Sequence, residues 1–170
     1  LAYEYFNPSF QKETIELIQD RDLGLYTNPL TKPVASLFFS LPNFNENEYM
    51  SWLIELQRDP IDLWERAYYT NMQRDKTAAN GIKRAYKATM FGYDVWVANT
   101  TDCFHEIAMS LAARGTFGAT YYENDRGHYV YSLRSIGDFD VADLAQKHAN
   151  GGGHKNAAGC SSPTKLHERK

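Results

Sequence analysis

The nine residues GGGHKNAAG at positions 151–159 decide how this sequence is interpreted. Glycine loses more conformational entropy on folding than any other residue, so three in a row favour a backbone that turns left-handed or admits a ligand closely. Successive N–H groups in such a loop form an anion-binding concavity, and His154 and Lys155 would add charge. We therefore interpret this run as a phosphate-binding loop, in which Ala157 and Ala158 open a short helix or turn that directs more amide dipoles to the same point.

Two alternatives to a phosphate-binding loop stay open on these residues alone. The run could be a flexible linker or a tight turn after the preceding helix, although linkers are usually richer in Ser and other polar residues. His154 could instead cap a helix, or it could lie in the core with its ring nitrogens hydrogen-bonded. The return of glycine at position 159, after a run of small residues, favours the phosphate interpretation.

A second motif lies about twenty residues upstream. The sequence YSLRS at 131–135 has the character of a strand, and Gly137 and the residues from Asp140 onward indicate a turn and a helix leading to the glycine run. Arg134 ends that strand, and a guanidinium there could bind phosphate in bidentate fashion. A surface ion pair is the alternative role for Arg134.

In this order, the two motifs resemble the DHH-associated domain, the C-terminal substrate-binding part of the DHH phosphoesterase family. That family includes RecJ-type exonucleases, nano-RNA and cyclic-dinucleotide phosphodiesterases, and exopolyphosphatase-like hydrolases. The resemblance covers roughly residues 85–163. It implies a substrate-binding site that consists of Asn99, Arg134, Gly151, Gly152, Gly153, His154 and Lys155, with Asn99 at a strand end beside the cleft. A turn-forming role is the equal alternative for Asn99.

Upstream, Phe6-Asn7-Pro8 and residues 18–23 resemble the end of the catalytic DHH domain, which implies that Asp20 is one ligand of a manganese pair. An ordinary helix-capping Asp is the alternative. No Asp-x-Asp motif precedes Asp20, and Asp-His-His occurs nowhere, so we expect the C-terminal part of a longer protein that is inactive alone and does not retain Mn²⁺. We assign no catalytic residue to this chain.

The apolar periodicity predicts an α/β protein with a helical N-terminal segment, residues 1–84, and a mixed sheet domain covered by helices, residues 85–170. The expected helices are one from Asn7-Pro8 to Asp20, two short ones near 34–41 and 45–56, and a long one from Asp59-Pro60. The sheet domain is expected to run β-β-α-β-β-α-loop, with strands near 87–90, 94–98, 117–123 and 128–134. Its helices are expected after Thr100, Thr101 or Asp102 and over about 140–148. His105 and Glu106 are assigned to the exposed side of the first of these.

Composition limits the class of protein. Of the 170 residues 43% are apolar, enough for an ordinary core, and no apolar run reaches the roughly 20 residues of a membrane helix. We therefore expect no membrane association and a cytoplasmic location. The net charge of −3 argues against a broad polyanion-binding surface, and Cys103 and Cys160 are interpreted as free thiols.

The function predicted from the sequence is the phosphate-binding part of a manganese-dependent phosphoesterase. Its expected ligand is a phosphate-bearing substrate such as a nucleotide or a short single-stranded oligonucleotide. The alternative is a non-catalytic nucleic-acid-binding module, because the related domain is also appended to alanyl-tRNA synthetases. A basic stretch between Arg74 and Lys87 could guide a nucleic-acid strand, a solvated helix face being the plainer interpretation.

Overall fold

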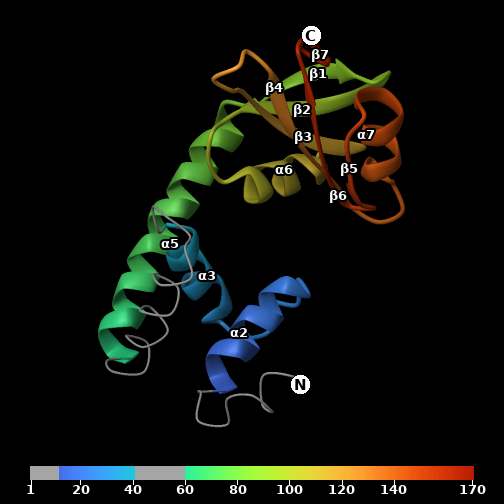
Figure 1. Ribbon diagram of the computed structural model, residues 1–170. Coiled ribbons are helices and arrows are strands. Elements are labelled where there is room, and N and C mark those ends of the chain that lie inside the picture. The colour runs from blue at the N-terminus through green and yellow to red at the C-terminus, as the bar shows by residue number, and fades with distance from the viewer. Residues whose placement is uncertain (1–11, 41–59) are drawn as a thin grey trace. The chain divides into compact units, whose positions relative to one another are not determined.

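The computed structural model describes residues 12–40 and 60–170 (Figure 1). The chain divides into two compact units, Leu1–Arg74 and Asp75–Lys170. The division falls within helix α5 (Pro60–Lys83), whereas the boundary predicted near residue 85 follows that helix. Helices precede a mixed sheet, so the α/β class predicted from the sequence is confirmed.

Helices α2 (Lys12–Asp22) and α3 (Thr31–Phe39) pack together in the first unit. Leu17 on α2 and Val34 and Leu37 on α3 are buried. Val34 and Leu37 lie three residues apart, the spacing predicted for an apolar helix face near 34–41. The expected cap at Asn7-Pro8 and the expected helix near 45–56 lie outside the described residues.

A seven-stranded sheet forms the second unit, with strand order β5-β6-β4-β3-β2-β1-β7. Strands β2 and β3 are parallel and every other neighbouring pair is antiparallel, so the sheet is mixed as expected. The strands are β1 (Tyr86–Met90), β2 (Tyr93–Asn99), β3 (Phe117–Glu123), β4 (Tyr129–Ser135), β5 (Gly152–His154), β6 (Ala157–Ser162) and β7 (His167–Arg169).

The sequence predicted the first four strands and the two helices between and after them. It did not predict β5, β6 and β7, for which we expected a loop. The first two consist mainly of Gly, Ala and Ser, which have little intrinsic strand preference, and β7 has only three residues. These strands form because their neighbours in the sheet offer hydrogen-bonding edges.

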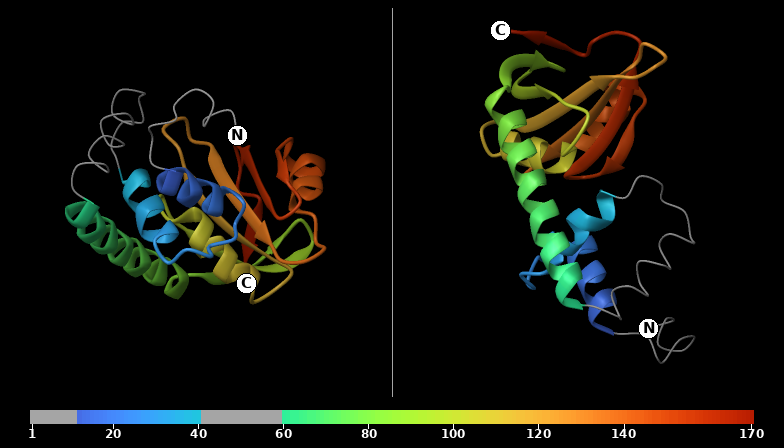
Figure 2. Two further views of the ribbon diagram at one scale, coloured as in Figure 1. Left: turned by 90° about the horizontal axis from the view of Figure 1, so that it is seen from below. Right: turned by 90° about the vertical axis from the view of Figure 1, so that its left-hand side faces the viewer.

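The two helices of this unit cover opposite faces of the sheet (Figure 2, left). Helix α7 (Val141–Ala149) packs over β6 and β5, where Phe117, Tyr131 and Leu133 contribute to a fully buried core. Helix α6 (Phe104–Ala112) packs over β3, β4 and β2 from the other side. Side chains along each strand therefore alternate between the face under α7 and the face under α6.

Gly118 allows α6 to lie directly on the sheet. A Cβ atom at this position would come within 2.2 Å of the Ala108 carbonyl oxygen and 2.5 Å of the Ala112 nitrogen. Because no side chain separates helix from strand here, the height of α6 above β3 is fixed by backbone contact.

The start of α6 differs from expectation. Its N-cap residue is Cys103, in a left-handed conformation with φ 53°, rather than Thr100, Thr101 or Asp102. The Asp102 carboxylate accepts a hydrogen bond from the Cys103 N–H at 2.6 Å. It therefore pairs with the N–H of the residue that precedes the helix and not with an N–H of the first helical turn. Cys103 and Cys160 are both buried free thiols, as expected.

Within residues 12–40 and 60–170, no helix is both long enough and apolar enough to cross a membrane.

Candidate functional site

The glycine run is the edge of the sheet, which corrects the expectation of a loop. Gly152, Gly153 and His154 form β5, and a two-residue turn of Lys155 and Asn156 leads into β6. Ala157 and Ala158 lie in β6 and not in a short helix or turn. The segment is thus a β-hairpin, and its order comes from strand pairing and not from a helix N-terminus.

Close backbone contacts explain two of the glycines. Gly153 has φ 149°, and a Cβ atom there would lie 2.4 Å from the Ala157 carbonyl oxygen and 2.7 Å from the Ala158 Cα atom. A Cβ atom at Gly151 would lie 2.3 Å from the Gly159 carbonyl oxygen. At Gly152, by contrast, a Cβ atom would meet nothing within 4 Å. This middle glycine faces open space.

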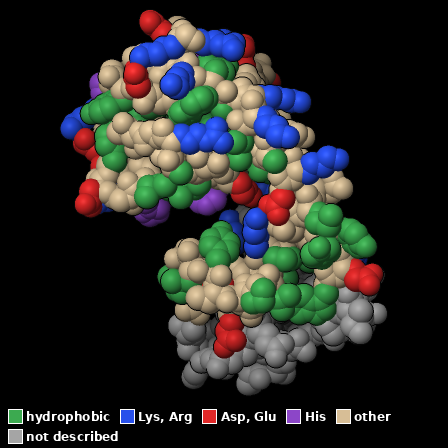
Figure 3. Space-filling model, turned by 180° about the vertical axis from the view of Figure 1, so that it is seen from behind, with side chains coloured by type: hydrophobic (Ala, Val, Ile, Leu, Met, Phe, Trp, Pro, Cys, Tyr) green, Lys and Arg blue, Asp and Glu red, His purple; other side chains and the backbone are tan. Residues whose placement is uncertain are grey.

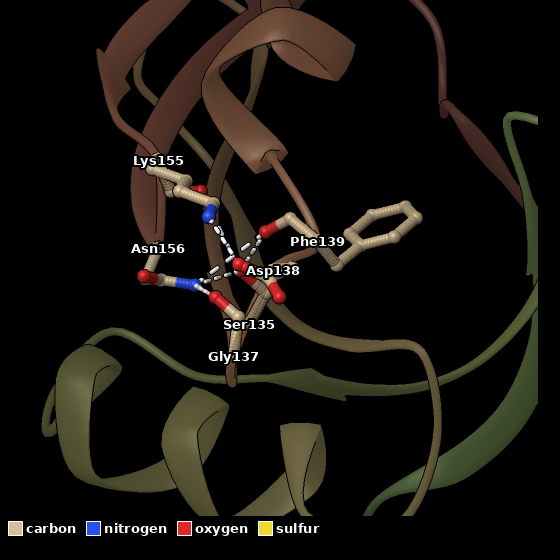
Figure 4. Close-up of polar contacts among 6 residues, drawn as sticks. All are labelled: Ser135, Gly137, Asp138, Phe139, Lys155 and Asn156. Atoms are coloured by element: carbon tan, nitrogen blue, oxygen red, sulfur yellow. Dashed lines mark hydrogen bonds and ion pairs between the residues drawn. The ribbon is translucent and has the colours of Figure 1, made fainter.

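The turn of the hairpin is anchored to the connection between β4 and α7 (Figure 4). The Asn156 amide nitrogen donates to Ser135 Oγ at 2.9 Å and to the Gly137 carbonyl at 3.0 Å. Ser135 Oγ in turn donates to the Phe139 carbonyl at 2.6 Å. Since these partners come from one short connection, Asn156 fixes where the hairpin ends.

Lys155 belongs to this anchor. Its Nζ atom forms an ion pair with Asp138 at 2.7 Å, and its carbonyl oxygen accepts the Val141 N–H at 2.8 Å. The structure therefore places the Lys155 side chain against the β4–α7 connection, and not beside His154 as the sequence motif suggested.

Strand register brings His154 and Arg134 into one row. His154 is paired with Ala157, Ala157 with Arg134, and Arg134 with Gly118. Directly paired residues point to the same face of a sheet, so both side chains lie on the face that α6 covers in part. With strands about 4.8 Å apart, the Cα atoms of His154 and Arg134 are separated by about 10 Å.

The surface between these two side chains is made of small residues. The Cβ of Ala157 lies between them in their own row, and the next row along the strands holds Gly152, Gly159 and Ser132. Gly152, Gly159 and His154 are exposed, and Ala157 is half-buried. Nothing larger than a hydroxymethyl group rises from this floor, so a ligand can reach the backbone.

A buried hydroxyl group adjoins the floor. Thr120 is paired with Ser132 in the second row and is fully buried. Its Oγ1 atom has no hydrogen-bond partner among the described residues.

Arg134 is half-buried and held by two hydrogen bonds. Its Nε atom donates to His105 Nδ1 at 3.2 Å, and its Nη1 atom donates to the Leu133 carbonyl at 2.8 Å. Burial lowers the pKa of Arg134, and the Glu106 carboxylate opposes that shift. The guanidinium remains a cation, because arginine is not deprotonated in proteins. His105 is exposed, as expected from the sequence, but its contact with Arg134 was not anticipated.

Asn99 does not join this row. It ends β2 and is paired with Tyr121. Tyr121 belongs to the core on the α7 face, so the alternation of β2 directs Asn99 away from Arg134. The Asn99 side chain is exposed at the end of its strand.

Asp20 lies in the other unit, where its carboxylate organises the loop between α2 and α3. It accepts hydrogen bonds from the Thr27 N–H at 3.0 Å, the Thr27 hydroxyl at 2.6 Å, the Asn28 N–H at 3.2 Å and the Thr31 hydroxyl at 2.5 Å. The hydrogen bonds from Thr27 and Thr31 hold the pKa of Asp20 far below its usual value. Both oxygens are thus engaged within the chain.

A manganese site does not fit the described residues. Residues 12–40 and 60–170 contain no group of three or more His, Cys, Asp or Glu side chains that could hold a metal ion. Asp22, the nearest other carboxylate in sequence, is exposed and pairs with Arg21 at 3.0 Å. We therefore derive no step of chemistry through a metal here.

His167 lies in a second polar cluster, which no sequence pattern indicates. Its Nε2 atom lies 2.7 Å from the Tyr86 hydroxyl and its Nδ1 atom 2.9 Å from the Tyr131 hydroxyl. Burial lowers the pKa of His167, and Lys165 lowers it further. The pairing of Met90 with His167 could not be anticipated, because a three-residue strand has no periodicity to read.

Lys and Arg side chains lie over one face of the Asp75–Lys170 unit with acidic side chains among them (Figure 3). Charges of both signs are therefore present on this face.

A family model matches the C-terminal part of the chain. Residues 106–170 match the family model described as DHHA1 domain. No curated protein matches the chain. Among solved structures, a pGpG-specific phosphodiesterase, PggH, from Vibrio cholerae matches with 12% identity and a TM-score of 0.52, over 94% of this chain and 65% of that one.

Two further structures show lower similarity. An exopolyphosphatase-related protein from Bacteroides fragilis matches with 20% identity and a TM-score of 0.47, over 84% of this chain and 45% of that one. An uncharacterized protein from Helicobacter pylori G27 matches with 21% identity and a TM-score of 0.37, over 82% and 41%. The chain thus spans less than two thirds of each of the three structures. At these identities only the similarity to the Vibrio structure is informative, and it concerns the fold.

Proposed function

We propose that this unit binds the phosphate group of a phosphoesterase substrate, because residues 106–170 match the DHHA1 domain model and carry the motifs described above. The observation that supports the proposal is the common row of Arg134 and His154 across an exposed floor of Gly and Ala. Substrates of this kind are nucleotides, short oligonucleotides or related phosphate esters.

Arg134 and His154 have complementary roles in this proposal. The guanidinium of Arg134 donates paired hydrogen bonds to two phosphate oxygens and supplies a permanent charge in a half-buried setting. His154 approaches from the edge strand and donates to a third oxygen. The floor lets the phosphate lie against the backbone between them. The unit binds and orients, while the reaction itself depends on groups outside the described residues.

Manganese dependence and a cytoplasmic location remain proposals for the whole protein. The manganese dependence rests on the resemblance of the motifs to the DHH phosphoesterase family. The described residues supply no manganese site, so we expect the purified chain to bind phosphate esters without hydrolysing them, with or without added Mn²⁺.

Titration with inorganic phosphate, followed by amide chemical shifts, tests the proposal. We expect the shifts to concentrate at residues 151–159 and around Arg134. Arg134→Lys and His154→Ala should each weaken binding about tenfold, because a charge-assisted hydrogen bond contributes about 1.5–3 kcal/mol.

Arg126→Lys is the matched control, since Arg126 lies in the exposed turn before β4, at the far end from Arg134. It should leave phosphate affinity unchanged. Shifts spread evenly over the surface, or equal losses for Arg126→Lys and Arg134→Lys, would contradict the proposal. Tight binding of a single-stranded oligonucleotide without a terminal phosphate, at residues other than these, would favour the nucleic-acid-binding alternative.

A further inference from the structure

The hydrogen bonds of Arg134 leave one edge of its guanidinium directed to a ligand. A guanidinium carries five N–H donors, and two of them are directed to His105 Nδ1 and to the Leu133 carbonyl. The three remaining N–H groups include both of those on Nη2. With Nε already engaged, a phosphate meets the Nη1/Nη2 edge and not the Nε side.

The contact with Leu133 does not by itself fix this orientation. Leu133 is the neighbouring residue on the same strand, so the bond ties the side chain only to its own backbone. His105 comes from α6, a separate element. A long side chain held from a second element loses rotational freedom before the ligand arrives, which lowers the cost of binding.

The position of His105 is itself determined by backbone contact. Gly118 is the register partner of Arg134, and α6 rests on Gly118 so closely that a Cβ atom would lie 2.2 Å from the Ala108 carbonyl. The helix therefore sits at a fixed height beside Arg134. His105, one turn before Ala108, is carried to the guanidinium by this packing.

Only a hydrogen-bond acceptor at the place of Nδ1 can receive the Arg134 Nε–H. The His105 ring must leave Nδ1 without a proton, so the neutral ring carries its proton on Nε2. An asparagine can offer its Oδ1 atom at nearly the same place, whereas a leucine offers no acceptor.

We propose that His105 is a positioning residue that orients the Arg134 guanidinium so that its Nη1/Nη2 edge meets the phosphate of the substrate. The inference rests on the proposed function of Arg134 as a phosphate-binding residue. It assigns His105 no direct contact with the substrate.

The Arg134 Nε–H signal in a ¹⁵N spectrum tests the orientation without any ligand. The signal is assigned by its loss in Arg134→Lys. We expect it to exchange slowly with solvent in the wild-type protein and in His105→Asn, and to broaden or vanish in His105→Leu. A substitution at 105 is compatible with folding because the His105 side chain is exposed.

Affinity for inorganic phosphate provides the second measurement. His105→Leu should weaken it about 3- to 10-fold, the range of one neutral hydrogen bond, whereas His105→Asn should stay within about twofold of the wild type. Rescue by Asn distinguishes positioning from helix packing, because Leu is the better helix former of the two.

Three outcomes separate the two proposals. Wild-type binding of phosphate at Arg134, with loss in His105→Leu and rescue in His105→Asn, supports both. Equal affinity and an equal Nε–H signal in all three proteins would overturn the role of His105 while leaving Arg134 in place. Absence of phosphate binding to the wild type would overturn the proposed function, whatever the Nε–H signal shows.

Discussion

The two faces of the same sheet differ in kind. On the α7 face, strands β3 and β4 present Phe117, Tyr131 and Leu133 to a closed core. On the opposite face the alternate residues of β4 and β6 are Arg134, Ala157 and Gly159, which leave backbone exposed beside a cation. One face thus stabilises the fold by burying apolar area, and the other forgoes burial so that a ligand can approach. Neighbouring positions on β4 should therefore fail in different ways when changed.

The largest effect is expected at Leu133. The side chain is fully buried, so Leu133→Ala removes apolar contacts and leaves a cavity that should lower the free energy of unfolding by about 2–5 kcal/mol. Arg134→Lys, one residue along, should change stability far less while weakening phosphate binding. Chemical denaturation measures the first effect and phosphate titration the second. Equal stability losses for both variants would break the distinction between the faces.

The adjacent glycines of β5 sharpen the comparison at the sheet edge. Gly153→Ala forces a Cβ atom against Ala157 and Ala158 at φ 149°, which should cost about 1–3 kcal/mol of stability. Gly152→Ala is its matched control, because a Cβ atom there meets nothing and should change stability by less than about 0.5 kcal/mol. Thermal unfolding of the two variants compares them directly. A larger loss for Gly152→Ala would show that the hairpin is not paired as described.

The smallest effect concerns pH and the cluster around His167. Its pKa is lowered in the folded protein from an unfolded value of about 6.5, so the unfolded chain takes up a proton more readily. The stability that the neutral ring contributes is fully present above about pH 6.5 and is lost as the pH falls through the lowered folded pKa. Denaturant midpoints between pH 7 and pH 5 should therefore fall, and His167→Gln should flatten that dependence.

A matched substitution on an exposed turn serves as the control. His128 lies between β3 and β4, so His128→Asn should retain the wild-type decline between pH 7 and pH 5. If the denaturant midpoint of His167→Gln fell as steeply between pH 7 and pH 5 as that of the wild type, the pH dependence would have another origin.

The sequence predicted the parts of this unit that have strong local signals. The hairpin of β3 and β4 follows from Asn124-Asp125-Arg126-Gly127, and α7 begins where the Asp140 carboxylate accepts the N–H groups of Ala142 and Asp143 at 2.9 Å. Strands β5 and β6 could not be predicted in this way, because Gly and Ala give no alternation. Their pairing depends on β4, which is distant in sequence.

The sequence motifs point to Arg134 and His154 but not to the arrangement of these two side chains. Arg134 and His154 were chosen from motifs, yet their common row follows only from the register of three strands. Lys155 and Asn99 were expected in the same site, but an ion pair to Asp138 and the alternation of β2 direct their side chains elsewhere. His105 reaches Arg134 because of how closely α6 lies on Gly118, a distance that no sequence pattern records.

The six register pairs between β4 and β6 constrain how the length of this region can vary. Side chains alternate faces with a period of two, so inserting or deleting one residue within β4 would exchange Leu133 and Arg134 between the core and the open face. Such a change would disrupt both the core packing and the candidate site, whereas many single substitutions would affect only one of the two. Length variation among related chains is therefore expected in turns such as residues 124–127, while β4 and β6 keep a constant residue count.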